Sequence, residues 1–207
     1  MIFQQYLAHQ LSNPTGIIGK FVLGPLWNKR NARLNEVTFD QLELKEDDRV
    51  LDIGFGGGYL LDRIIPQVKR GLAAGIDISA MMVENCRARY QEEIKAGRVD
   101  IQWGRVEMLP YPDGYFTKVS SVNSLFYWRD ARQGVSEIYR ILAVEGKVVL
   151  TYTCRKDLEK KGFGQYGVKT YAEEEVQQML IKAGFREIKE IRDGDRHRAF
   201  ICVTGCK

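Results

Sequence analysis

From residue 49 onward, short apolar runs alternate with longer segments in which apolar residues recur every three or four positions. The short runs are typical of buried strands, and the longer segments are typical of amphipathic helices. Strands are predicted over residues 49–54, 71–77, 98–103, 116–122, 146–153, 186–192 and 198–205. Helices are predicted over Tyr59–Val68, Ala80–Lys95, Ala131–Leu142 and Ala172–Ala183.

The order of these elements predicts an α/β fold. Alternating strands and helices favour a parallel sheet with helices on both faces. The last two strands are separated only by DGDRH (193–197), which is too short for a helical crossover and contains an Asp-Gly turn signal. The expected fold is therefore a Rossmann-like, seven-stranded, mostly parallel sheet that ends in an antiparallel C-terminal hairpin.

Helix ends are predicted from residue types with known capping preferences. Ser79 is expected to cap the helix that starts at Ala80, and Thr170 is expected to open the last helix. Gly184 is a stop signal, because glycine readily adopts the left-handed conformation that ends many helices.

The first 48 residues follow a different pattern, since prolines and glycines interrupt them before the helical-looking segment 27–42. We interpret residues 1–48 as an N-terminal helical cap over the ligand-binding edge of the sheet, and 49–207 as the main domain. Trp27, Lys29, Arg30 and Arg33 could close over a substrate. The alternative is that Trp27 belongs to the core and the charges form a solvated face.

Composition narrows the function classes. The 207 residues carry a formal net charge of +4, and basic and acidic residues are interspersed, so a nucleic-acid partner is neither required nor excluded. Four cysteines without a CxxC pair and two histidines argue against a zinc site and favour a reducing compartment. No secretory signal or membrane span is recognisable, so we expect a cytoplasmic location.

The stretch VLDIGFGGGYLL (50–61) carries the strongest chemical signal. It joins a strand to a helix through a glycine turn, and such turns at the carboxyl edge of a sheet commonly bind ligands. A phosphate-binding P-loop would need Lys and Ser or Thr where Tyr59 and Leu60 stand. The dinucleotide fingerprint GxGxxG would need glycine at Tyr59. A merely tight turn would need fewer glycines.

Several ordered segments resemble class I S-adenosylmethionine-dependent methyltransferases. VLDIGFGGG resembles their first motif and AAGIDIS (73–79) their second, while residues 104–128 and 137–150 are similar to segments of the subgroup that includes ubiquinone and menaquinone biosynthesis methyltransferases and many small-molecule methylases. Two departures stand out. Arg105 replaces the aspartate that often contacts the adenine amino group, and Glu145-Gly146 replaces a Pro-Gly, which we expect to be neutral.

The resemblance implies S-adenosyl-L-methionine as cofactor and S-adenosyl-L-homocysteine as product. Asp77 would accept hydrogen bonds from the ribose hydroxyls, Ile78 would lie against the adenine, and Asp52 would orient the ammonium of the methionine part. Carbonyls near Gly54 and Asn123 would hold that ammonium. The implied cofactor contacts are Asp52, Gly54, Phe55, Gly56, Gly58, Asp77, Ile78, Arg105, Val106 and Asn123.

The acceptor site is less defined. Ser124, Tyr127 and Trp128 follow the fourth strand and are expected, with Trp27, to face the acceptor. The weak candidates for a general base are His9, Tyr115 and Tyr127. Thr153-Cys154 occupies the place of the nucleophilic Thr-Cys pair of RNA cytosine-C5 methylases, but their Pro-Cys after strand four is missing.

The preferred function is methyl transfer to a small-molecule or lipid-like acceptor at oxygen, carbon or nitrogen. Methylation of RNA or protein is the alternative within the enzymes. A NAD(P)-dependent oxidoreductase and a non-catalytic cofactor-binding protein are the alternatives from other classes. Oligomeric state and acceptor identity do not follow from the sequence.

Overall fold

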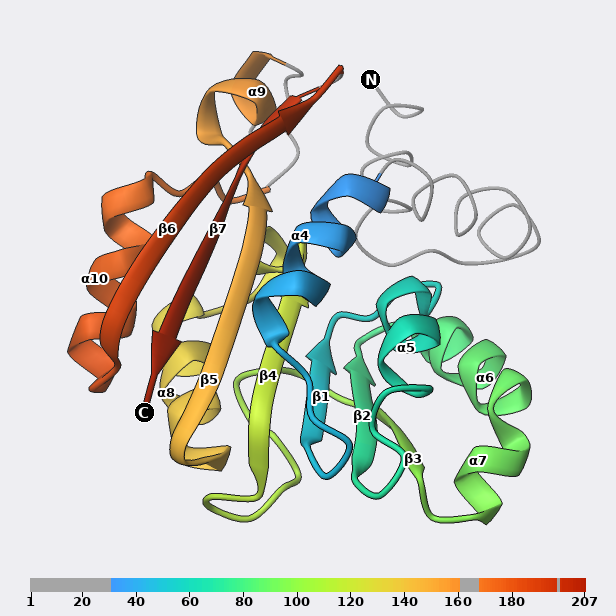
Figure 1. The fold of residues 1–207 in the computed structure, drawn as a ribbon. Coiled ribbons are helices and arrows are strands. Elements are labelled where there is room, and N and C mark those ends of the chain that lie inside the picture. The colour runs from blue at the N-terminus through green and yellow to red at the C-terminus, as the bar shows by residue number, and fades with distance from the viewer. Residues whose placement is uncertain (1–30, 161–167, 197) are drawn as a thin grey trace.

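The computed structural model describes residues 31–160, 168–196 and 198–207. Within these ranges the strands form one seven-stranded sheet in the order β3-β2-β1-β4-β5-β7-β6 (Figure 1). The strands are β1 (Arg49–Ile53), β2 (Leu72–Asp77), β3 (Val99–Trp103), β4 (Phe116–Val122), β5 (Leu142–Thr153), β6 (Arg186–Asp195) and β7 (Arg198–Cys206). The predicted strands and their Rossmann-like arrangement are confirmed.

Strands β1 to β5 run parallel, whereas β7 runs antiparallel to both β5 and β6. Because Thr153 pairs with Phe200, the end of β5 and the start of β7 lie at the same edge of the sheet. This edge also carries the ends of β1, β2 and β4. The two strands of the hairpin are longer than predicted. Strand β6 continues through Asp193-Gly194 to Asp195, which pairs with Arg198, so the Asp-Gly pair belongs to the strand and not to the turn.

Helices cover both faces of the sheet, as predicted (Figure 1). One apolar layer packs α4, α5 and α6 against the sheet, and the other packs α8 and α10 against the opposite face. The helices of the described residues are α4 (Ala32–Leu42), α5 (Tyr59–Ile64), α6 (Ala80–Arg89), α7 (Gln91–Lys95), the 3-10 turn η2 (Leu125–Tyr127), α8 (Ala131–Ile141), α9 (Arg155–Lys160) and α10 (Glu173–Ala183). None of them is long and apolar enough to cross a membrane.

Two helix predictions are wrong in length. The first helix ends at Ile64 rather than Val68, because Pro66 lacks the N–H that another turn would require. The segment predicted as one helix over 80–95 is divided at Tyr90, whose buried hydroxyl lies 2.7 Å from Asp62 Oδ1 and 3.1 Å from Gly58 O.

The capping predictions have mixed outcomes. Gly184 ends α10 with a left-handed φ of 107°, as predicted. Thr170 does not open α10, which begins at Glu173, and the N–H of Ala172 instead donates to Glu175. Ser79 stands at the N-cap of α6 without a side-chain capping hydrogen bond.

The described part of the predicted N-terminal cap is α4, which lies across the strands on one face of the sheet (Figure 1). Thr38 Oγ1 donates to Thr151 Oγ1 at 2.6 Å and so connects α4 to β5 inside the core. Only the first turn of α4, with Asn31 and Asn35, reaches the carboxyl edge of the sheet. The boundary at residue 48 stays a prediction, and residues 1–30 lie outside the described ranges.

Glu145 has a φ of 64°, in the left-handed region where glycine is favoured. We expected the replacement of Pro-Gly by Glu145-Gly146 to be neutral. The left-handed backbone at Glu145 argues against this, because a residue with a side chain in this conformation costs about 1–2 kcal/mol of stability. The residue lies at the bend where β5 approaches β4, away from the carboxyl edge.

Candidate active site

A cavity opens at the carboxyl edge of the sheet and extends from the glycine turn after β1 to the start of β7. Its lining residues come mainly from the ends of β1, β2 and β5, from the loops after β1, β2, β3 and β4, and from the first turn of α4. Single residues of α5, α6, α9, β7 and the segment before α10 complete the lining. They are Asn31, Asn35, Asp52 to Gly57, Tyr59, Ile76 to Ile78, Met82, Gly104 to Glu107, Val122 to Ser124, Phe126 to Trp128, Thr153, Leu158, Val168 and Arg198.

The glycine turn shapes the floor of this cavity. Gly54 has a φ of 72°, and its N–H donates to Ile76 O at 2.8 Å. A Cβ atom there would lie 2.4 Å from the Cβ of Ser124. Gly56 has a φ of 52°, and a Cβ at this position would meet no atom within 4 Å. Gly54 thus allows two segments of the protein to pack, whereas Gly56 leaves bare backbone beside open space.

Gly58, which we predicted as a cofactor contact, does not line the cavity. A Cβ at Gly58 would lie 2.8 Å from the Tyr90 hydroxyl and 3.0 Å from Cys86 Sγ. Arg89 Nη1 also donates to Gly57 O at 2.9 Å. The absence of a side chain at Gly58 therefore allows α6 to pack against the glycine turn.

Asp77 ends β2 and is nearly buried, with 8% of its surface exposed. Its carboxylate accepts from Gly56 N and from Ser79 N, both at 2.8 Å. Burial raises the pKa of Asp77, while these backbone hydrogen bonds act in the opposite direction. Asp77 therefore holds the glycine turn in place and still faces the cavity.

Asp52 is the second buried acid of the cavity, with 3% of its surface exposed. Ser120 Oγ donates to Asp52 Oδ1 at 3.0 Å. Burial raises the pKa of Asp52 to about 7, and the negative charge of Asp77 acts in the same direction. A carboxyl group with this pKa is partly ionised at neutral pH and is stabilised as an anion by any cation that enters the cavity.

The wall after β2 and β3 is apolar. Ile78, Met82 and Val106 line it, and Val106 is buried beneath the N-terminal part of α8. Arg105, which replaces the aspartate common in the resembling family, is exposed at the rim of the cavity. Its side chain therefore lies at the cavity entrance and not among the buried lining residues. Trp103, which the sequence analysis did not select, donates from Nε1 to Ile78 O at 2.9 Å and fixes this segment.

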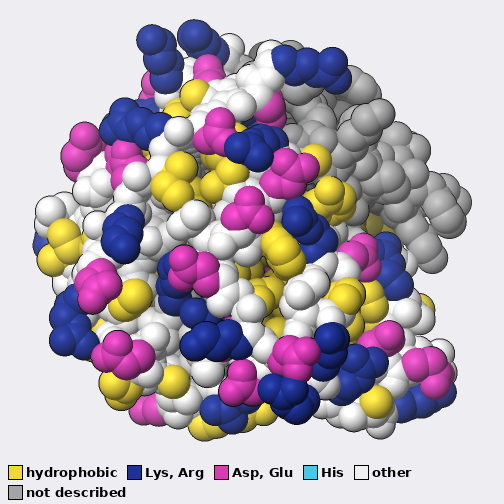
Figure 2. Space-filling view, in the orientation of Figure 1, with side chains coloured by type: hydrophobic (Ala, Val, Ile, Leu, Met, Phe, Trp, Pro, Cys, Tyr) yellow, Lys and Arg dark blue, Asp and Glu magenta, His cyan; other side chains and the backbone are white. Residues whose placement is uncertain are grey.

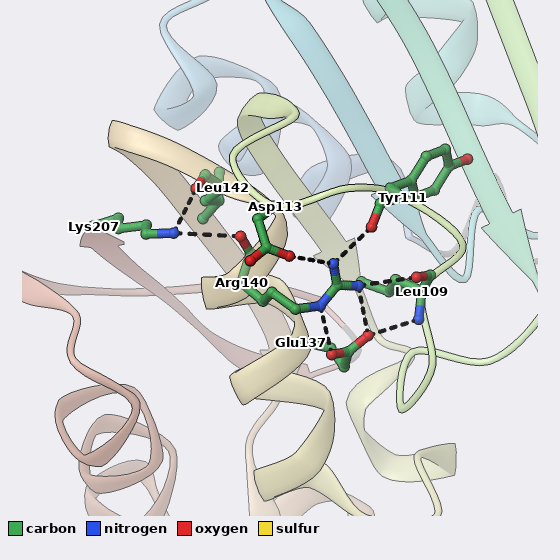
Figure 3. Close-up of polar contacts among 7 residues, drawn as sticks. All are labelled: Leu109, Tyr111, Asp113, Glu137, Arg140, Leu142 and Lys207. Atoms are coloured by element: carbon green, nitrogen blue, oxygen red, sulfur yellow. Dashed lines mark hydrogen bonds and ion pairs between the residues drawn. The ribbon is translucent and has the colours of Figure 1, made fainter.

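The loop between β3 and β4, which carries Arg105 and Val106, is held by Arg140 of α8 (Figure 3). The guanidinium donates to the carbonyl oxygens of Leu109 and Tyr111 at 3.0 and 2.7 Å, and to the carboxylates of Glu137 and Asp113. Glu137 in turn accepts from Leu109 N at 2.9 Å. Arg140 and Glu137 therefore hold the backbone of the LPYPD segment (109–113), and with it the adjoining cavity wall that contains Val106.

The next part of the cavity follows β4 and is lined by Asn123, Ser124, Tyr127 and Trp128. The sequence analysis predicted that these residues follow the fourth strand. Asn123 has a left-handed φ of 54°, and its N–H donates to Thr151 O at 2.8 Å. Ser124 Oγ donates to Ile53 O at 3.1 Å and accepts from Trp128 Nε1 at 3.0 Å. Burial raises the pKa of Tyr127 to about 12, so its hydroxyl is protonated at neutral pH.

The far end of the cavity contains a group of polar residues, of which the sequence analysis missed Asn31 and Arg198. Asn31 Oδ1 accepts from Arg198 Nη2 at 2.5 Å and from Asn123 Nδ2 at 3.1 Å. Thr153 donates to Asn123 Oδ1 through its N–H at 2.8 Å and its hydroxyl at 3.1 Å. We call Asn31, Asn123, Thr153 and Arg198 the arginine cluster. No local motif marks it, because its members come from four separate segments.

Some candidates are not in the cavity. Tyr115 precedes β4 at the opposite edge of the sheet, where Arg49 stacks 4.7 Å from its ring centre and Phe116 packs against it. We therefore do not retain Tyr115 as a general base. His9 and Trp27 lie outside the described residues. Burial raises the pKa of the Cys154 thiol, which does not favour a thiolate nucleophile.

Comparison with known proteins gives a consistent result. Residues 51–150 match the family described as a methyltransferase domain. The chain is 28% identical over 187 residues to the uncharacterized methyltransferase YdaC of Bacillus subtilis, covering 90% of this chain and 98% of that protein.

A second relative is named for its substrate. The chain is 30% identical over 149 residues to 2-methyl-6-phytyl-1,4-hydroquinone methyltransferase 2, chloroplastic, of Oryza sativa subsp. japonica, and spans 42% of its length. Among solved structures, a SAM dependent methyltransferase from Aquifex aeolicus has a TM-score of 0.69 at 18% identity, covering 98% of this chain and 97% of that one. This last similarity concerns the fold.

Proposed function

Because the chain belongs to the class I S-adenosylmethionine-dependent methyltransferases, we propose that it transfers a methyl group to a small-molecule or lipid-like acceptor. The observation that carries the acceptor class is the apolar wall of the cavity beyond Asn123. Phe126, Trp128, Leu158 and Val168 are each less than 10% exposed and line this wall. An apolar acceptor would bury its surface against these side chains.

The cavity fits the cofactor at three places. The open space beside Gly56 admits a ligand to the backbone, where a side chain would block it. Asp77 presents carboxylate oxygens that accept from the backbone N–H groups of Gly56 and Ser79 and can also accept from ribose hydroxyls. Ile78, Met82 and Val106 form an apolar slot suited to the adenine.

The bound cofactor supplies an activated methyl group on a sulfonium. The protein then mainly aligns the acceptor with that methyl group, and such alignment can contribute roughly 7–11 kcal/mol. In this proposal Asp52 and the carbonyls near Gly54 and Asn123 hold the cofactor's ammonium, while Ser124, Tyr127 and Trp128 position the acceptor. Tyr127 is too weak an acid to exist as a phenolate at neutral pH, so it serves as a hydrogen-bond donor.

One comparison and one surface feature support a small acceptor. The rice relative is named as a hydroquinone methyltransferase, and a prenylated hydroquinone is an apolar acceptor with polar oxygens. On the face in Figure 2, lysine and arginine side chains alternate with aspartate and glutamate, so this face has no broad basic patch for a nucleic acid. Family membership leaves the oxidoreductase alternative without support.

The test is a transfer assay with cofactor labelled on the methyl group and a fractionated cell extract. We expect label in the organic-soluble or small-metabolite fraction. Label confined to RNA or to protein would overturn the proposed acceptor class. The control is the Gly56→Ala variant, which should retain its fold and lose the transfer.

A further inference from the structure

Strand β6 forms one edge of the sheet, since within the described residues it pairs with β7 alone (Figure 1). An edge strand presents a row of backbone N–H and C=O groups to which another strand can pair. A shift in register between Arg186 and Lys189 interrupts the pairing with β7, and the pairs from Lys189 to Asp195 then follow each other without a gap. The regular part of this edge therefore begins at Lys189.

Side chains alternate between the two faces along this regular part. Ile191 packs against the apolar layer that contains α4, and Asp193 accepts a hydrogen bond from Arg33 of α4. On the opposite face, Glu190 accepts a hydrogen bond from Gln177 of α10. The period of two places Lys189, Ile191 and Asp193 on one face and Glu190 and Arg192 on the other.

A second copy of the chain, related by a two-fold axis perpendicular to the sheet, can pair its β6 antiparallel to this one. Residues directly opposite each other must then lie on the same face, so the pairing is centred on a residue that lies opposite its own copy. A centre at Lys189, Glu190, Arg192 or Asp193 sets two like charges against each other. A centre at Ile191 sets an apolar residue against itself. It also places Glu190 opposite Arg192 and Lys189 opposite Asp193, each twice by symmetry. The sequence of this edge is therefore complementary to itself in one register.

The helix beside this edge adds exposed apolar surface. Gln177 of α10 donates to Glu190 of β6, so this side of α10 faces the edge strand. Ile181 lies one helical turn further along the same side, and 50% of its surface is exposed. A second sheet edge placed along β6 would cover part of this surface.

We propose that β6 is a dimer interface, at which two copies of the chain pair antiparallel about Ile191 and join their sheets into one. The opposite charges on either side of Ile191 select the register and favour a second copy over an unrelated strand. None of the residues from Lys189 to Asp193 lines the cavity, so the dimer leaves the candidate active site open. The proposal is independent of the reaction that the cavity catalyses.

The test is sedimentation velocity of the whole chain over a series of concentrations. We expect the wild type to form a reversible dimer. Arg192→Glu and Lys189→Glu, both at exposed positions, each place like charges opposite one another at two points. Each should weaken dimerisation about tenfold or more. The double variant Glu190→Lys with Arg192→Glu exchanges the two charges, restores the opposite pairs in the same register, and should recover the dimer.

The matched control is Lys95→Glu on α7, which lies at the other end of the sheet (Figure 1). Lys95 is 60% exposed and pairs with Glu92, much as Arg192 is 66% exposed and pairs with Glu190. This variant should dimerise as the wild type does. Each interface variant should also bind S-adenosylhomocysteine with the affinity of the wild type, because the substituted side chains lie outside the cavity.

Hydrogen exchange locates the interface. Exchange of the backbone amides in 189–193 should slow as the wild-type concentration rises, and it should not change with concentration in Arg192→Glu. Three results would overturn the proposal: a wild type that stays monomeric at every concentration, which would leave the edge to a strand of another protein, a dimer that neither single charge reversal weakens, or a weakened dimer that the double variant does not recover.

Discussion

The two ends of the cavity are built in different ways. At the cofactor end, most residues that line the cavity come from short segments at and just after the ends of β1, β2 and β3. At the acceptor end, Asn31 and Arg198 share a hydrogen bond across 167 positions of the chain. The first end depends on backbone conformations within short motifs, whereas the second exists only after the terminal hairpin and α4 have packed against β5. Residues adjacent in the chain therefore form one end of the cavity, whereas residues from distant segments form the other.

The largest expected effect is a difference in stability between alanine substitutions at two glycines of the same turn. Gly54→Ala should lower the free energy of unfolding by about 2–5 kcal/mol, because the new methyl group collides with Ser124 and the backbone is left-handed. Gly56→Ala should cost only the conformational strain of about 1–2 kcal/mol, because its Cβ would meet open space.

Chemical denaturation and cofactor titration of both variants measure this difference. We expect Gly56→Ala to be the more stable of the two and to bind S-adenosylhomocysteine much more weakly than the wild type. Equal cofactor affinity in Gly56→Ala and wild type would mean that the ligand does not approach the backbone here.

Asp77→Ala should weaken cofactor binding by roughly 1–3 kcal/mol, because ribose hydroxyls would lose a charged acceptor and the Gly56 N–H would lose its partner. The control is Asp40→Ala, whose side chain is exposed on α4 and lies outside the cavity. Calorimetric titration compares the two variants. An unchanged affinity in Asp77→Ala would mean that the ribose binds elsewhere, and the assignment of this end of the cavity to the cofactor would be wrong.

Asp52 predicts a pH dependence at the cofactor end. Burial raises the pKa of this carboxyl group from about 3.8 in an unfolded chain to about 7 in the folded protein, so the native state binds more protons than the unfolded chain between these values. Its contribution to stability is therefore complete below the unfolded pKa and declines as pH rises toward 7. The melting temperature of Asp52→Asn, without ligand, should fall less than that of the wild type between pH 5 and about 8.

The affinity for the cofactor should change with pH in the opposite direction to the stability of the protein. The ionised carboxylate attracts the ammonium, so we expect S-adenosylhomocysteine affinity to rise about tenfold as the pH increases through about 7. This rise should be smaller in Asp52→Asn and absent for 5′-methylthioadenosine, which has no ammonium. A rise of equal size for both ligands would exclude Asp52 as the ammonium partner.

The smallest expected effect lies at neither end of the cavity. Glu145→Gly should raise the free energy of unfolding by roughly 0.5–1 kcal/mol, because relief of the left-handed strain exceeds the added backbone entropy of glycine. Thermal denaturation measures the gain, and cofactor affinity should not change. A loss of stability would show that Glu145 makes contacts worth more than its strain.

Prediction from sequence was most successful where periodic patterns extend over a whole element. The strands and their parallel order with a terminal hairpin followed from alternating apolar runs and from one short connection. Helix ends were less predictable: Tyr90 interrupts a helical pattern because its side chain contacts Asp62 and Gly58, and the pattern itself contains no sign of that contact. For the same reason, Gly58 was assigned to a ligand although it packs against α6.

By itself, the sequence determined the fold class, the position of the glycine turn and the two acids near the ends of β1 and β2, because each depends on residues adjacent in the chain. Only the tertiary structure decided which polar groups meet at the far end of the cavity. Asn31, Thr153 and Arg198 become neighbours because α4 packs across β5 and β7 pairs with β5, and no spacing along the chain encodes that contact. The burial that raises the pKa of Asp52 arises in the same way, since segments distant in the sequence exclude water from it.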